Sequence, residues 1–142
     1  MKTADLRILG LARRAGYIAA GEDAVILSIM GKSARLALLS NDLGQTARKK
    51  IIAAAGRCNI PCLTISADMA ELGYAIGRGK TGAAAVEDIG LAASFAESMR
   101  GEGEEFEKTA DALSEKAKRL KKRKKETQQK RADIKTGKRR TK

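Results

Sequence analysis

The segment "GRGKTG" at residues 77–82 contains the residue types that bind nucleotide phosphates. A phosphate-binding loop needs a Gly, four intervening residues and then Gly-Lys-Ser/Thr, and it leads from a strand into a helix. Tyr74 occupies the position of the first Gly, and Gly73 comes one residue too early. The apolar pattern also predicts a helix before the segment and a strand after it, which is the reverse order. We therefore interpret the segment as a glycine helix cap followed by a turn, and expect no nucleotide hydrolysis.

Two cysteines and several acidic side chains are the other groups that could take part in catalysis or bind a metal. Cys58 and Cys62 stand four residues apart, and the chain contains no His. Two thiols alone cannot complete a tetrahedral zinc site, and without His neither His metal ligation nor His-dependent catalysis is available. The acidic residues stand mostly at predicted helix starts, where they complement the helix dipole. These patterns predict structural thiols instead of a redox or metal pair, and a protein that is not an enzyme.

Charge is the strongest global signal in the sequence. The 142 residues carry a formal net charge of +12, which favours a polyanionic partner, either nucleic acid or an anionic membrane surface. No apolar run reaches the roughly 18 residues that would span a bilayer, and residues 1–10 contain no secretory signal. We therefore expect a cytoplasmic protein.

The charge is concentrated at one end of the chain. Residues 1–100 contain 13 Lys and Arg against 9 Asp and Glu, whereas residues 101–142 contain 16 against 8. The second region also has few bulky apolar side chains. We therefore predict a folded domain over 1–100 and a charged tail over 101–142.

Within the first region, short apolar runs alternate with amphipathic stretches. Strand-like runs occupy 17–21, 34–40, 62–66 and 82–88. Helical periodicity precedes or follows each of them, and Asp68 and Asp88 stand where helix caps belong. Apolar runs between amphipathic helices are typical of an α/β protein. The pattern predicts a mixed or mostly parallel four-stranded sheet covered by helices on both faces.

Three segments together match a known family in order and spacing. They are "GLARRAGYIAAGEDAV" (10–25), "ARLALLSNDLGQTARKKI" (34–51) and "NIPCLTISADMAELGYAIGRG" (59–79). Over about residues 4–97 the chain resembles the superfamily of kink-turn RNA-binding ribosomal proteins, and most closely its small bacterial YlxQ-like branch. The most specific block is Ile-Pro-Cys followed by Glu-Leu-Gly-x-Ala-x-Gly. The resemblance implies a three-layer α/β/α sandwich that binds structured RNA without a cofactor.

The resemblance also implies where RNA would bind. In this superfamily the start of the second helix and the loop before the fourth helix form one RNA-facing edge. By matching motifs, these regions correspond to Gly21, Glu22 and Asp23, and to Ile65, Ser66, Ala67 and Asp68. A helix start offers free N–H groups to phosphate, and a short apolar loop can pack against an extruded base.

The second helix departs from the family's kink-turn binders, which usually carry Asn-Glu followed three residues later by Lys. This chain has Glu22-Asp23 and then Ile26, so a favourable ammonium contact is missing. We therefore expect structured RNA as the ligand without specifying a kink-turn, and helix capping as an additional role for the two acids. The cations that would replace the missing charge, each of which also suits a solvated helix face, are Arg13, Arg14, Lys49 and Lys50.

The tail contains an apolar stripe and a basic run. The stripe recurs at intervals of four, three, four and three residues, at Phe106, Ala110, Leu113, Ala117 and Leu120. It predicts a helix over about 104–125 that docks on the domain or on a partner, with disorder from 126 onward. Phosphate contacts are expected from Lys121, Lys122, Arg123, Lys124 and Lys125. A second basic run, "GKRRTK", occupies 137–142.

The sequence therefore favours a non-enzymatic protein that binds structured RNA, associated with the ribosome or with rRNA, whose tail adds unspecific phosphate contacts. The alternative is a protein–protein adaptor that uses the sandwich and the tail helix. An anionic-membrane anchor would need a bulky apolar face, which the tail lacks. Nothing in the sequence requires a dimer, and we expect a monomer.

Overall fold

In the computed structural model, which describes residues 6–135, short apolar segments pair into one four-stranded sheet. The strands are β1 (Ile18–Ala20), β2 (Leu36–Leu39), β3 (Cys62–Thr64) and β4 (Ala83–Val86). Their order is β1-β4-β2-β3, in which β2 and β3 are parallel and β4 is antiparallel to both β1 and β2. The predicted four-stranded mixed sheet is therefore confirmed.

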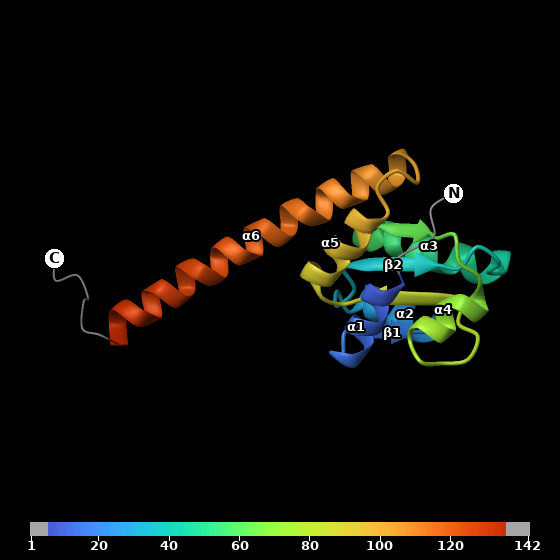
Figure 1. Ribbon diagram of the computed structural model, residues 1–142, viewed down its shortest axis with the longest axis horizontal. Helices are drawn as coiled ribbons and strands as arrows, with labels where there is room; N and C mark the ends of the chain where they lie inside the picture. Colours follow the sequence, from blue (N-terminus) through green and yellow to red (C-terminus); the bar gives the residue numbers. More distant parts are fainter. Residues whose placement is uncertain (1–5, 136–142) are drawn as a thin grey trace.

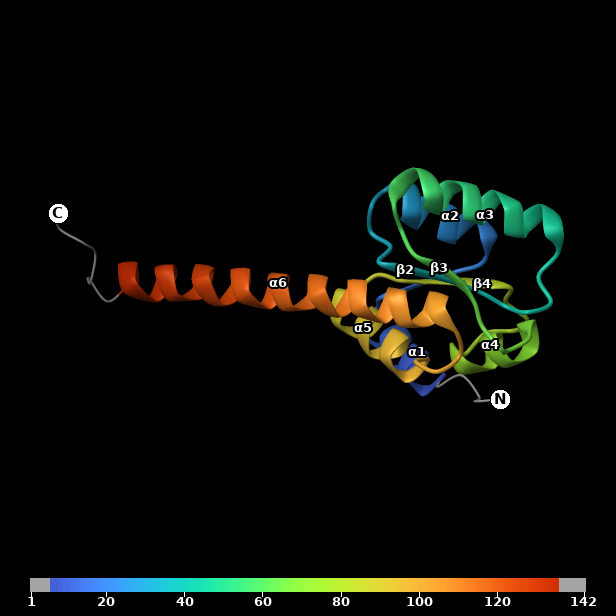
Figure 2. The same cartoon turned by 90° about the horizontal axis from the view of Figure 1, so that it is seen from above.

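Helices lie on both faces of this sheet. They are α1 (Arg7–Arg14), α2 (Glu22–Met30), α3 (Gln45–Cys58), α4 (Met69–Ala75), α5 (Ile89–Ser98) and α6 (Glu104–Lys135). Figure 2 shows α2 and α3 above one face, and α1, α4, α5 and the beginning of α6 below the other. The arrangement is the three-layer α/β/α sandwich that the sequence predicts.

Alternate residues of β2 enter two separate cores. Leu36 and Leu38 pack with the layer that contains α1, α4 and α5, whereas Ala37 and Leu39 pack with the layer of α2 and α3. Successive residues of a strand point to opposite faces of the sheet. Because helices cover both faces, all four side chains are fully buried. The apolar run predicted at 34–40 therefore contains a strand that is covered on both sides, although the strand itself is limited to Leu36–Leu39.

The first part of α6 belongs to the core of the sandwich. Ala110 and Leu113 are buried, and Phe106 and Ala117 pack against the same cluster, mainly beside α5. The apolar stripe therefore docks on the domain, which was one of the two alternatives that the sequence left open. The core consequently extends beyond residue 100, where the sequence placed the end of the folded domain.

Arg100 holds the turn between α5 and α6. Its guanidinium group donates to Glu97 on α5 (Nε to Oε2, 2.8 Å) and to two acids on α6, Glu107 (Nη1 to Oε1, 2.9 Å) and Asp111 (Nη2 to Oδ1, 2.6 Å). Chiefly through the bonds from Arg100, the pKa of Glu97 is lowered from its usual value. The acidic beginning of α6 is thus engaged within the protein.

Beyond Leu120, α6 projects away from the sandwich (Figure 1), and its side chains are exposed from 121 to 132. The helix continues to Lys135, so the disorder expected from 126 onward is not found there. The reason is composition, because Lys, Arg, Gln and Glu are strong helix formers as well as residues typical of disordered segments. The basic run at 137–142 lies outside the described residues. Despite its length α6 is too polar to cross a membrane, and no other helix between residues 6 and 135 is suited to do so.

Candidate nucleic-acid interface

One end of the sheet gathers the loops that the resemblance singled out. The Gly21 N–H donates to the Ala83 carbonyl at 2.9 Å, and the Asn41 N–H donates to the Ala67 carbonyl at 2.9 Å. Because β4 lies between β1 and β2, these bonds place the start of α2 and the loop before α4 along the same edge. We call this surface the loop edge, comprising residues 21–23, 40–44, 65–69 and 82.

The start of α2 is open at the loop edge. Gly21 has φ 94° and ψ 157°, a conformation essentially restricted to glycine, and within residues 6–135 no side chain caps the helix. The N–H groups of the first turn therefore have no intrahelical acceptor and no capping side chain. Glu22 pairs with Lys50 of α3 instead, with 3.8 Å between Oε1 and Nζ. Asp23 lies in the same turn, so the two acids complement the helix dipole without capping the helix.

The start of α4 is closed by carboxylates. The Asp68 side chain accepts a bond from the Glu71 N–H at 2.8 Å, and the Glu71 side chain accepts one from the Asp68 N–H at 3.1 Å. Asp42 Oδ1 also accepts a bond from the Met69 N–H at 3.0 Å. Asp68 and Glu71 thus form a capping box, and the helix cap predicted at Asp68 is confirmed. Since these donors are engaged, α2 offers the freer helix start for a phosphate.

The loop before α4 is less accessible than the sequence suggested. Ile65 and Ala67 are buried in the core between the sheet and α4, whereas Ser66 and Asp68 are half-buried. The two apolar side chains therefore anchor the loop to the core and are not exposed to a base. Residues 65 and 67 point inward because the alternation of side chains along β3 continues into the loop.

A different apolar pair lies at the loop edge. An added methyl carbon on Gly82 would lie 2.5 Å from Leu43 Cδ1 and 3.7 Å from Met69 Cγ, so both side chains border this glycine. Leu43 and Met69 are half-buried. The sequence did not identify these two residues, because they approach Gly82 only in the folded protein, where β2 pairs with β4. The glycine at position 82 was the one indication in the sequence that side chains pack closely there.

The remaining expected cations are distributed over other surfaces. Arg13 and Arg14, at the end of α1, share a shallow pocket with the exposed Tyr74. The carbonyl of the following Tyr17 accepts a bond from Glu87, at the end of the sheet opposite the loop edge. Lys49 is exposed on α3, next to the Lys50 that pairs with α2. Exposed positions on the projecting part of α6 hold Lys121, Lys122, Arg123, Lys124 and Lys125.

Residues 77–82 form the helix cap and turn that the sequence predicts. Gly77 has φ 70°, and the Arg78 N–H donates to the Gly73 carbonyl at 2.8 Å, which closes the end of α4. A methyl carbon on Gly73 would lie only 1.9 Å from the Gly79 carbonyl oxygen. Glycine at 73 therefore lets the turn pack directly on α4.

The two cysteines are free and half-buried at the end of α3 and the start of β3. Burial, reinforced by the carboxylate of Glu105 and opposed by Arg48, raises the pKa of the Cys62 thiol to about 11. A thiol that stays protonated at neutral pH is a poor nucleophile and metal ligand. Between residues 6 and 135, no group of three or more metal-binding side chains is arranged to hold an ion.

Comparison with known proteins identifies sequence relatives. No protein-family profile matches the chain. A protein from Bacillus subtilis (strain 168) named RNA-binding protein YlxQ is 35% identical over 85 residues, which cover 60% of this chain and 84% of the relative. A protein of the same name from Enterococcus faecium is 29% identical over 73 residues, covering 51% of this chain and 70% of the relative. These names describe binding proteins and not enzymes, as the sequence predicted.

Solved structures share the fold. A protein of unknown function from Bacillus halodurans C is 31% identical with a TM-score of 0.64, and the match covers 68% of this chain and 97% of that one. A 15.5 kD RNA-binding protein from Giardia lamblia has a TM-score of 0.58 at 18% identity, covering 76% of this chain and 85% of that one. The second likeness shows the fold alone. Because the match to the Bacillus subtilis protein extends over most of its length, the chain belongs to the YlxQ family.

Proposed function

We propose that the protein binds structured RNA through the loop edge and catalyses no reaction. The observation that carries the proposal is the open start of α2, where Gly21 leaves the first N–H groups uncapped and an added methyl carbon would meet nothing within 4 Å. Backbone N–H groups at a helix start are a ready site for a phosphate. The printed names of the two YlxQ relatives support RNA as the ligand.

The surroundings of this helix start favour a particular RNA shape. Leu43 and Met69 present an apolar surface on which an extruded base can pack. Lys50 partly neutralises Glu22, whereas Asp23 repels any phosphate that passes beside the helix axis. The loop edge therefore favours RNA with an unpaired base next to a bent backbone over a regular duplex.

The exposed basic part of α6 adds contacts of a less selective kind. Residues 116–125 contain eight Lys and Arg and no Asp or Glu. Cations that follow a phosphate backbone release counterions, which raises affinity for all RNAs and makes binding sensitive to salt. Together with the net charge of +12, these contacts suit a cytoplasmic, monomeric protein associated with rRNA or the ribosome.

The alternative function, a protein–protein adaptor that docks through the tail helix, loses its main support. The apolar stripe of α6 was the surface on which a partner would have docked. Ala110 and Leu113 of that stripe are buried against the protein's own core. What α6 presents to solvent beyond residue 120 is charge.

Two glycines provide a matched test of the loop edge. Gly21 (φ 94°) and Gly16 (φ 84°) both have positive φ and open space around an added methyl carbon, but they lie at opposite ends of β1. Each Gly→Ala variant carries backbone strain of about 1–3 kcal/mol, so circular dichroism must first show that both are folded. Only Gly21→Ala places a methyl group where RNA would approach α2.

The assay is fluorescence anisotropy with a stem–loop RNA that contains an asymmetric internal loop, a plain stem–loop and a duplex DNA of equal length. We expect the wild type to prefer the first RNA. Gly21→Ala should reduce that preference by about fivefold or more, whereas Gly16→Ala should keep it. Equal loss of preference in both variants, or none in Gly21→Ala, would contradict binding at the loop edge.

A further inference from the structure

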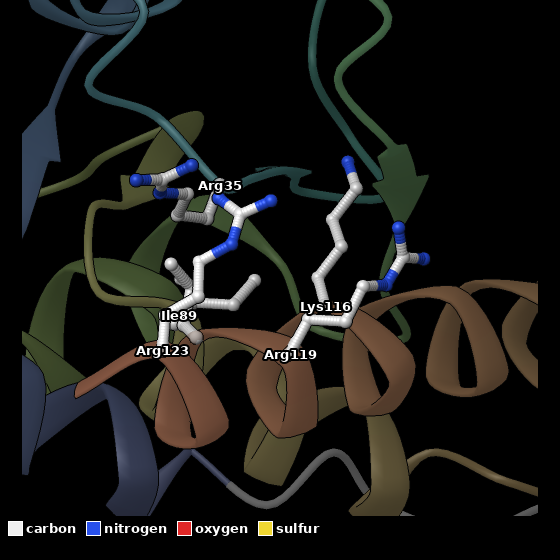
Figure 3. Close-up of a pocket in the computed structure, with 6 residues that line it drawn as sticks. Arg35, Ile89, Lys116, Arg119 and Arg123 are labelled. Carbon is white, nitrogen blue, oxygen red and sulfur yellow. The ribbon is translucent and has the colours of Figure 1, made fainter. Parts of the chain in front are cut away.

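A cationic pocket lies at the end of the sandwich opposite the loop edge. The Arg35 N–H donates to the Val86 carbonyl at 2.8 Å, which fixes Arg35 at that end of the sheet. Between Arg35 and α6 is a cavity of about 180 Å³. One water molecule needs only about 10–15 Å³ of such a cavity, so the pocket has room for a phosphate group and part of its hydration shell. Its lining residues, shown in Figure 3, are Arg35, Ile89, Lys116, Arg119, Leu120 and Arg123.

The helical cations of the pocket share one face of α6. Lys116, Arg119 and Arg123 are spaced three and four residues apart, so they follow one another along the helix surface. In Figure 3 the Lys116 and Arg123 side chains rise from this face toward the side where Arg35 emerges, whereas the Arg119 side chain extends along the helix, away from Arg35. The packing of Ala117 against the core holds this turn of α6 in place. The pocket is therefore built jointly by the sandwich, by a docked turn of α6 and by Arg123 at the beginning of its projecting part.

No carboxylate of the described residues lines this pocket. The lining residues include four cations and no acid, and among the described residues none of the four cations makes a salt bridge. Arg100, between α5 and α6, instead bonds to three carboxylates. The four cations are exposed, so water and salt screen their mutual repulsion, and a bound anion would offset what remains of it at low salt.

We propose that this pocket holds a backbone phosphate of the bound RNA, as a second contact point at the far end of the sandwich from Gly21. The inference rests on the proposed RNA-binding function and goes beyond it, because it makes RNA contact both ends of the domain. Guanidinium groups bind phosphate oxygens through two parallel hydrogen bonds, and three arginines line the pocket. Arg35, which composition alone gives no reason to single out, becomes a binding residue.

RNA phosphate suits the pocket better than a lipid headgroup. Among the described residues that line the pocket, Ile89 and Leu120 are the apolar ones, and both lie among cations. A membrane-binding surface would need a bulky apolar face beside the charge. The basic positions that continue along α6 beyond the pocket, by contrast, extend the positive charge in the direction that a polyanionic chain would follow.

A double-mutant cycle tests whether Arg35 and Arg123 hold the same phosphate. Full-length wild type, Arg35→Ala, Arg123→Ala and the double variant are titrated with the stem–loop RNA that contains an asymmetric internal loop. Each single change should weaken binding by about fivefold. The double variant should be weaker than either single one but at least about twofold tighter than the product of the two single effects predicts, because both side chains bind one shared phosphate.

Lys121→Ala is the matched control, because it removes one charge from the same helix at a position outside the pocket lining. Its effect should multiply with that of Arg35→Ala, since distant sites act independently. The melting temperature of Arg123→Ala at low salt should equal or exceed that of wild type, because the change relieves repulsion and introduces a strong helix former. A fall in melting temperature would assign Arg123 a structural role and overturn the inference.

The outcomes separate this inference from the proposed function. If wild type binds the RNA no better than duplex DNA, the proposed function fails and the pocket inference fails with it. If wild type selects RNA while Arg35→Ala binds as tightly as wild type, or the effects of Arg35→Ala and Arg123→Ala simply multiply, only the pocket inference is wrong. It is also wrong if inorganic phosphate raises the melting temperature of wild type but not of Arg35→Ala while both bind RNA equally, because the pocket then serves a free anion.

Discussion

Replacing Gly73 with Ala should destabilise the protein through a collision between α4 and the turn that follows it. The added methyl carbon would lie 1.9 Å from the carbonyl oxygen and 2.7 Å from the carbonyl carbon of Gly79. Close contacts between carbon and oxygen atoms begin at about 3.3 Å, so the turn would have to move by more than about 1 Å. Because the obstacle is backbone, no change of rotamer can relieve the collision.

The change in the free energy of unfolding is the sum of one stabilising and two destabilising contributions. Ala favours the helical conformation over Gly by about 1 kcal/mol. Overpacking that displaces backbone costs about 1–3 kcal/mol or more, and the Arg78 N–H bond to the Gly73 carbonyl, worth about 1 kcal/mol, is also at risk. We expect the free energy of unfolding to fall by about 1–3 kcal/mol.

Gly56 supplies the control for this prediction. It lies in α3, is exposed, and an added methyl carbon there would meet nothing within 4 Å. Gly56→Ala should therefore raise the free energy of unfolding by about 0.5–1 kcal/mol. Urea unfolding followed by circular dichroism measures both variants. If Gly73→Ala is as stable as wild type, or if both variants shift in the same direction, the close approach of the 77–82 turn to α4 is wrong.

Three further predictions concern the core, a thiol and α6. Ser40→Ala should raise the free energy of unfolding in urea by about 1 kcal/mol, because the Ser40 hydroxyl is buried with no hydrogen-bond partner among the described residues. When the folded protein is alkylated at pH 9, Cys62 should react roughly fifty-fold more slowly than free cysteine. Its rate should increase as the pH approaches the thiol pKa of about 11, and mass spectrometry of the peptide that contains Cys62 measures both rates. Removing 121–142 should leave the melting temperature nearly unchanged, whereas removing 101–142 should lower it strongly because buried side chains of α6 leave the core.

The shorter truncation also tests the role of the basic run in RNA binding. Residues 121–142 hold 12 of the 29 Lys and Arg and 2 of the 17 Asp and Glu, so their removal lowers the net charge from +12 to +2. Affinity for all RNAs should fall to a similar extent, and the salt slope should decrease by about 0.7 for each single-strand phosphate that the shortened chain no longer binds. Preference among RNAs should remain, and its disappearance would move recognition from the loop edge to the tail.

Features that depend on neighbours in the sequence could be predicted. The apolar run at 34–40 can only be stable when covered on both faces, and Asp68 with Glu71 three residues later closes a helix start whatever surrounds it. The order of elements around 77–82 likewise excluded a nucleotide loop, because that loop requires a strand before it and a helix after it.

Features that depend on residues distant in the sequence could not be predicted. Leu43 and Gly82 meet only because β2 pairs with β4, and Arg35 faces α6 only because the tail docks beside α5. The sequence around an apolar loop residue such as Ile65 does not indicate whether its side chain faces the core or a ligand. The composition after residue 125 is also typical of both a solvated helix and a disordered chain, so it does not decide where α6 ends.

The most direct measurement of RNA binding at the loop edge is an NMR titration of the isotope-labelled full chain with the stem–loop RNA that contains an asymmetric internal loop. Binding at the open start of α2 predicts the largest backbone amide shifts at Gly21, Glu22 and Asp23, with accompanying shifts at 66–68. These shifts should persist at higher salt, while those along the basic part of α6 shrink. Shifts confined to α6, with the amides of Gly21–Asp23 unchanged at saturation, would contradict the proposed site.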